Sequence, residues 1–176
     1  GSRLYVCGNL SNRLLELDAT TGVRLRTWDV GVAPYDVVLV RGKAYVSNWG
    51  GRRPDARSVT GPAGRGTVVR VDPVRPLASG GSVSVIELAE GGANVRASRG
   101  GGGSSVASLH RVQEILTGLH ASAMTLSPNG HWLVVANAGS DTLSVLDTRT
   151  DKIIETIWMR QNPADLFGAQ PNALAF

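Results

Sequence analysis

Hydrophobic and polar residues alternate along most of the chain in short runs, which are separated by turns rich in Gly, Asn, Asp, Ser and Thr. The segments Leu4–Leu25 and Leu133–Ile154 align without a gap. In both, an alternating run is followed by a polar turn, a second run that ends in Leu-Asp, a Thr-rich turn and a third run. Such runs are typical of antiparallel strands joined by hairpins. The chain therefore contains an internal repeat.

A third, less regular copy lies between these two. Ala44–Asn48 matches the first strand of the other copies, and Gly81–Leu88 matches the second. A fourth element completes each unit, because Gly31–Leu39, Gly118–Leu126 and Gly168–Phe176 each begin with Gly and run into an apolar strand. Four short strands in a unit of about 40 residues are typical of a β-propeller blade. Each Gly-initiated strand is expected to be the innermost strand of the next blade.

The expected fold is all-β, with three four-stranded propeller repeats over about residues 4–39, 43–126 and 132–176. Three repeats are too few to close a ring, because propellers have roughly four to eight blades. Two copies could form a six-bladed ring by self-association, with Pro171–Phe176 of one copy completing the Leu4 blade of the other. Alternatively, the remaining blades belong to a longer parent chain.

Two insertions split the middle repeat. Residues 52–80 are rich in Gly, Pro and Arg and contain one strand-like run, Thr67–Asp72, so a long loop with a small hairpin is expected. Residues 89–110 include Gly100–Ser104, whose composition is typical of a flexible linker. Arg111–Leu116 is too short for a helix and is expected to be a strand.

Composition excludes several classes of function. The net charge is +4, and the excess of basic over acidic residues is concentrated in the loops 52–70 and 96–111 without interleaved aromatic residues, so nucleic-acid binding is not indicated. No apolar run approaches the about 20 residues of a membrane span. The single cysteine, Cys7, excludes an internal disulfide. Its alternating apolar neighbours predict a buried hydrophobic position rather than a reactive thiol.

No catalytic residue, metal site or cofactor is predicted, because the sequence contains neither a nucleophile elbow nor a Walker loop. His110 adjoins the Gly-rich insertion, His131 lies in a turn and His120 opens an inner strand. The positions equivalent to His120 hold Ala33 and Gln170, so the repeats do not bring several metal ligands together. Aspartates that end strands are expected to accept hydrogen bonds from their own turns. They are Asp18, Asp72 and Asp147.

Polar and aromatic side chains are expected to gather at one mouth of the central channel. The predicted binding residues are Tyr35, Asp36, Trp49, His120, Ser122, Gln170 and Asn172. Trp49 begins the Arg-rich insertion and is the best candidate for contact with a ligand. Trp28 aligns with Ile115 and Ile157, so it is expected to pack between blades. The leading hypothesis is a module that binds a small ligand or a protein, and the competing one is hydrolysis through channel residues.

Several motifs resemble the YVTN-type β-propeller repeat of YncE-like and lactonase-like proteins. They are Tyr45–Asn48, Ser127–Gly130, Val135–Asn137 and Asp141–Asp147. The resemblance implies a periplasmic, secreted or cell-surface protein, although no signal peptide is visible. Ser47–Arg53 and Phe167–Phe176 resemble a narrower subset in which a phosphoesterase domain follows the propeller. The printed sequence contains no phosphoesterase segment, so the resemblance implies an accessory role rather than that activity.

Overall fold

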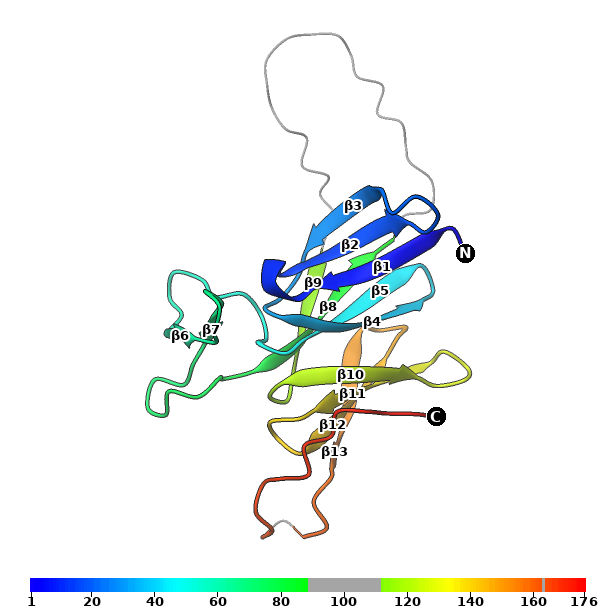
Figure 1. The fold of residues 1–176 in the computed structure, drawn as a ribbon. Coiled ribbons are helices and arrows are strands. Elements are labelled where there is room, and N and C mark those ends of the chain that lie inside the picture. The colour runs from blue at the N-terminus through cyan, green and yellow to red at the C-terminus, as the bar shows by residue number, and fades with distance from the viewer. Residues whose placement is uncertain (89–111, 163) are drawn as a thin grey trace.

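The computed structural model describes residues 1–88, 112–162 and 164–176. Three antiparallel sheets follow one another along the molecule, and a small hairpin projects beside the second sheet (Figure 1). This arrangement confirms the prediction of all-β propeller blades. The described part of the chain holds no helix that is long and apolar enough to cross a membrane. The predicted linker at 89–110 lies outside the described residues.

Each sheet is built from strands that are consecutive within a blade. The first sheet contains β1 (Arg3–Gly8), β2 (Arg13–Asp18) and β3 (Arg24–Asp29). The second sheet contains β4 (Pro34–Val40), β5 (Lys43–Asn48), β8 (Gly81–Glu87) and β9 (Val112–Thr117). The third sheet contains β10 (Ala121–Leu126), β11 (Trp132–Asn137), β12 (Thr142–Asp147) and β13 (Lys152–Trp158). A short 3-10 turn, η1 (Asn9–Ser11), connects β1 to β2.

The insertion after β5 folds as a separate hairpin of β6 (Thr60–Pro62) and β7 (Val68–Arg70). The expected hairpin in this loop is therefore confirmed, as is the strand expected near residues 111–116, which is β9. At the hairpin tip, Gly64, Arg65 and Gly66 all have positive φ. Two glycines in this turn suit the left-handed backbone, which costs other residues about 1 kcal/mol or more.

The Gly-initiated elements become inner strands only where another strand follows them. β4 pairs with β5 and β10 pairs with β11, as predicted. Residues 168–176 form no strand, and the prediction of a strand there is wrong for this structure. An extended segment is counted as a strand only when a neighbour accepts and donates its backbone hydrogen bonds, and none of the described strands pairs with residues 168–176. Correspondingly, no strand of the described residues lies on the inner side of β1 in the first sheet.

The core lies between the sheets, in two hydrophobic layers. The residues between the first and second sheets are Leu14, Trp28, Val30, Ala44, Val46 and Ile86. The residues between the second and third sheets include Tyr45, Val83, Val85, Leu133, Val135 and Leu146. Neighbouring residues of β5 and β8 belong to different layers, because successive side chains of a strand point to opposite faces. The burial of Trp28 between blades was predicted and is confirmed.

The turns between strands are stabilised as the sequence indicated. Asp18 Oδ1 accepts hydrogen bonds from the backbone amides of Thr20 and Thr21, at 2.9 and 2.8 Å. Asp72 and Asp147 make the same kind of contact with amides two and three residues further on. The backbone amides lower the pKa of all three carboxyl groups, because they stabilise the charged form. These aspartates therefore have a structural role.

A buried polar contact joins the second and third sheets. The Tyr45 hydroxyl donates to Asp151 Oδ1 at 2.5 Å, and Lys43 Nζ lies 2.6 Å from Asp151 Oδ2. Burial, followed by the hydrogen bond to Asp151, raises the pKa of Tyr45, so the phenol stays protonated and can donate. The contact links β5 of one blade to the last hairpin turn of the next.

The contact of Tyr45 gives a stability prediction. Tyr45→Phe keeps the aromatic packing and removes the donor to the largely buried Asp151. We expect the free energy of unfolding in urea to fall by about 1–3 kcal/mol, because a buried acceptor loses its partner. Tyr35→Phe is the matched control, since Tyr35 is half exposed and should lose almost nothing. Equal stability of the two variants would contradict the structural role of the Tyr45 hydroxyl.

Candidate functional site

A cavity of about 500 Å³ lies at one end of the inner strands. Its walls come from the η1 turn, the start of β4, the residue after β5 and the tip of the β6–β7 hairpin. The lining residues are Asn9, Leu10, Ala33, Tyr35, Trp49, Ala63, Gly64, Arg65, Thr67 and Val69. We call this cavity the hairpin pocket. Its volume falls in the range of small-molecule sites, about 300–1,000 Å³.

The inserted hairpin provides one side of the hairpin pocket, and its own hydrogen bonds fix its tip. The Ala63 amide donates to the Thr67 carbonyl at 2.8 Å, and the Thr67 amide donates to the Gly64 carbonyl at 2.8 Å. This tight turn presents Arg65, the one charged residue among those that line the pocket. Opposite, Asn9 Nδ2 donates to the Pro34 carbonyl at 3.3 Å, which ties the η1 turn to β4.

Trp49 is held in place by His120. The two rings stack with centroids 3.8 Å apart and an angle of 3° between their planes. Behind them, a Cβ atom on Gly139 would lie only 2.5 Å from His120 Nδ1, so the glycine makes room for the imidazole. Burial lowers the pKa of His120, because the charged form loses its hydration. A neutral imidazole therefore supports the indole that lines the hairpin pocket.

The backbone at His120 belongs to a motif shared by the three repeats. Ala33, His120 and Gln170 have φ angles of 53°, 57° and 40°. These left-handed residues lie immediately before β4, before β10 and within the C-terminal segment. Asn12 Oδ1 accepts the Ala33 amide at 2.9 Å, and Asp141 Oδ1 accepts the Gln170 amide at 2.9 Å. A side chain from one blade thus fixes the entry to β4 in the first case and the start of the C-terminal segment in the second.

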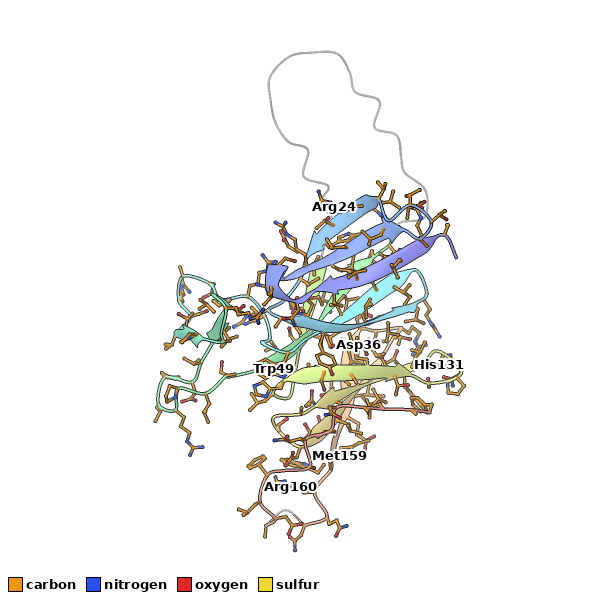
Figure 2. All side chains as sticks on the ribbon, viewed as in Figure 1. Arg24, Asp36, Trp49, His131, Met159 and Arg160 are labelled. Atoms are coloured by element: carbon orange, nitrogen blue, oxygen red, sulfur yellow. The ribbon has the colours of Figure 1, made fainter. Side chains whose placement is uncertain are left out.

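The structure brings two of the predicted binding residues, Tyr35 and Trp49, into the hairpin pocket. Tyr35 is half exposed there, so its ring can contact a ligand. His120 contributes through its stack on Trp49 and does not line the cavity itself. Figure 2 shows Trp49 near one end of β10 and His131 near the other. His131 lines a separate cavity of about 260 Å³ with Arg41, Trp132, Asp147 and Arg149.

The carboxylate of Asp36, a predicted binding residue, connects two inner strands. Its Oδ2 accepts the Met124 amide of β10 at 2.8 Å, and its Oδ1 accepts the Val37 amide at 2.8 Å. Asp36 lies between β4 and β10 in Figure 2. Both inner strands have a bulge at this level, which opens the backbone for such a contact. The carboxylate therefore faces a backbone amide rather than the hairpin pocket.

The remaining predicted binding residues lie away from the hairpin pocket. Ser122 Oγ donates to the Ala136 carbonyl at 3.1 Å and lies 3.4 Å from the Pro171 carbonyl. Gln170 and Asn172 belong to the exposed C-terminal segment. The structure therefore places these three residues beside the third sheet. Their part in ligand binding stays a prediction.

Sequence reasoning missed the pocket residues of the η1 turn and of the hairpin tip. A signal for Asn9 and Leu10 was present, because the match of Val46 to Val6 puts Trp49 at the position of Asn9 in the repeat. Arg65 carried no such signal, since its place depends on how the insertion folds back.

Other reactive groups give no further site. Burial raises the pKa of Cys7 to about 11, so its thiol is largely protonated near neutral pH and a poor nucleophile. Among the described residues, no group of three or more His, Cys, Asp or Glu side chains could hold a metal ion. His110 lies outside the described residues.

Comparison with known proteins identifies the fold class. No family model matches the sequence, and no curated protein matches it. The structure is similar to Kuenenia stuttgartiensis hydrazine synthase, with a TM-score of 0.57 and 18% identity, over 90% of this chain and 33% of that one. A putative 6-phosphogluconolactonase from Bacteroides uniformis gives a TM-score of 0.51 and 13% identity, over 90% and 37% of the two chains. Dihydro-heme d1 dehydrogenase NirN gives a TM-score of 0.53 and 13% identity, over 89% of this chain and 24% of that one.

These similar structures are β-propellers, and the chain is a β-propeller segment. It spans between 24% and 37% of the length of each. At such low identity the likeness establishes the fold, while activity must be argued from this chain's own residues.

The stack on Trp49 predicts how stability depends on pH. Because the pKa of His120 is lowered in the folded protein, the unfolded chain takes up the proton first as the pH falls below about 6.5. Stability is therefore lost with falling pH. In urea unfolding at about pH 7.5 and about pH 5.5, the wild-type protein should lose more stability than His120→Asn, in which Asn tolerates the left-handed backbone. Equal losses would contradict the burial of His120.

Proposed function

We propose that this propeller segment is a binding module whose hairpin pocket accepts a small, flat, partly apolar molecule with one negative charge. The observation that carries the proposal is the pocket itself, in which Tyr35 and the supported indole of Trp49 line the same cavity. Aromatic side chains that are held in one orientation bind flat rings well, because ring stacking adds binding free energy to that of burying apolar surface. Leu10 and Val69 add apolar surface.

The charge of the ligand is proposed from Arg65. Its guanidinium is the sole charged group among the lining residues, and a planar guanidinium binds carboxylates and phosphates with two parallel hydrogen bonds. Asn9 and Thr67 supply further hydrogen-bonding groups. A molecule such as an aromatic carboxylate matches this combination in shape and charge.

The finer family assignment also belongs to this proposal. The motifs that resemble the YVTN repeat lie on the strands and turns of the observed blades, which supports membership in that group of propellers. Membership would place the protein in the periplasm or outside the cell.

A hydrolase-associated propeller is the second candidate function. It is favoured by the likeness of the fold to two putative 6-phosphogluconolactonases and by the neutral imidazole of His120 close to the hairpin pocket. Against it, the carboxylate nearest in sequence to the pocket aromatics, Asp36, is bonded to backbone amides. A binding module should not accelerate the hydrolysis of δ-gluconolactone above its rate in buffer. Acceleration that is lost in His120→Ala would favour the hydrolase instead.

The ring contact gives a binding prediction. Calorimetric titration with 2-naphthoate should show a dissociation constant about tenfold higher for Tyr35→Ala, which corresponds to about 1.4 kcal/mol of lost contact. Tyr35→Phe is the matched control and should bind as the wild-type protein does, because the ring remains. Unchanged affinity in Tyr35→Ala would contradict a site at the hairpin pocket.

The charge requirement is tested with a neutral ligand of the same shape. Arg65→Gln should weaken 2-naphthoate and leave 2-naphthylmethanol unaffected, since only the carboxylate pairs with the guanidinium. Arg75→Gln removes an arginine from the same insertion outside the pocket and should change neither affinity. A loss of affinity for the alcohol as well would show that Arg65 supports the fold of the hairpin rather than the charge of the ligand.

A further inference from the structure

We propose that β1 binds residues 171–176 of a second copy of this chain as its inner strand, which joins two three-blade units into one closed ring. This proposal is independent of the ligand proposed above. It starts from an unequal pairing within the molecule. β5 and β11 are hydrogen-bonded on both edges, whereas β1 pairs only with β2 among the described strands. The free edge of β1 carries backbone groups ready to pair.

The C-terminal segment already follows the path of an inner strand. Asp141 accepts the Gly168 amide at 2.8 Å and the Gln170 amide at 2.9 Å. Asn12, at the equivalent position of the first blade, accepts the Ala33 amide just before β4. The segment then runs past the third sheet towards the C-terminus (Figure 1). The chain thus directs residues 171–176 to where the inner strand of a following blade belongs.

The repeats fix the register of the proposed pairing. Val37 lies opposite Val46 in the second sheet, and Met124 lies opposite Val135 in the third. The equivalent residues of the proposed pair are Leu174 and Val6. By the same rule, Ala173 lies opposite Cys7, because the corresponding residues of the second sheet, Asp36 and Ser47, are paired. Phe176 is then opposite Leu4, as Leu39 is opposite Ala44.

The two outer sheet faces expose positions that the inner interfaces bury. Ile157 is 40% exposed on the third sheet, whereas its equivalents Trp28 and Ile115 are 3% and 9% exposed. On the first sheet, Leu4 is 50% exposed, and its equivalents Ala44 and Leu133 are fully buried. In the inner interfaces, a neighbouring blade covers the equivalent positions. A second copy covers both positions by continuing the interface that already joins the three blades.

Two copies related by a two-fold axis satisfy all these requirements. They supply six blades, within the range of about four to eight for closed propellers. Each copy donates its C-terminal segment and receives that of the other, so the contact is isologous. In the existing blades, the Trp49 and Ala138 amides donate to the carbonyls of Ala33 and His120. The same bond would place Gln170 of the second copy against Asn9, at the rim of the hairpin pocket.

The native cysteine provides the test. In Ala173→Cys the introduced thiol should lie opposite Cys7 of the second copy, and Cys7 is the chain's sole cysteine. Dithiodipyridine, a two-electron oxidant, should then give a covalent dimer within minutes, while wild-type protein and Leu174→Cys, whose side chain points to the other face, should give little. Light scattering after size exclusion should give about twice the 18.5 kDa chain mass for all three proteins.

Two results would overturn the proposal. A wild-type mass of 18.5 kDa at micromolar concentration would show that residues 171–176 of a second copy do not pair with β1. A second such result is a dimer in which Ala173→Cys and Leu174→Cys form the covalent product equally, or in which neither forms it. The copies would then associate through another surface or in another register. Circular dichroism of the reduced variants confirms that each has kept its strands.

Discussion

The packing of one sheet against the next determines this structure, because its sheets carry apolar side chains on both faces. Such a sheet is stable only when both faces are covered. The second sheet meets this condition, and β5 is almost entirely buried. The first and third sheets meet it on one face each, so their outer faces retain exposed leucine, isoleucine and tryptophan side chains. The burial of the second sheet and the exposed outer faces of the other two sheets both follow from this constraint.

Polar contacts set the angle at which successive sheets meet. Apolar burial is not directional, whereas a hydrogen bond requires a defined distance and direction. Asn12 fixes the chain as it enters β4, and Asp141 fixes the start of the C-terminal segment. The Asp36 carboxylate joins two inner strands through a backbone amide. Tyr45 and Asp151 add a contact nearer the opposite end of the blades. These bonds select one arrangement among the many that the hydrophobic layers alone would allow.

Much of the fold could be predicted from the sequence because the chain contains three copies of the repeat. Each position in one copy can therefore be compared with the equivalent positions in the other two. The alignment of Trp28 with Ile115 and Ile157 predicts a position between blades, and Trp28 is buried there. The same comparison failed for residues 168–176, since a strand also requires a neighbour, and the local pattern does not specify where that neighbour comes from. Repetition therefore predicts the unit better than it predicts the assembly.

The candidate site was less predictable, for a related reason. Trp49 was recognisable as an aromatic residue at the start of an insertion, but Arg65 reaches the hairpin pocket only because the insertion folds back. No repeat exists for an insertion, so nothing in the sequence could be compared with it. Likewise, residue type suggested Asp36 as a ligand contact, whereas its carboxylate is bonded to the Met124 amide.

The hairpin pocket lies at the C-terminal end of β1, because Asn9 and Leu10 follow β1 directly and line the cavity. A strand added to β1 would therefore complete the rim of the pocket. If the proposed pairing forms, a ligand that contacts this rim would bind the associated form more tightly than the separate chain, and by linkage it would also strengthen association. If the hairpin pocket binds a ligand and β1 pairs with a second copy, ligand affinity should therefore rise with protein concentration. Association of the two copies should likewise become tighter when the ligand is present.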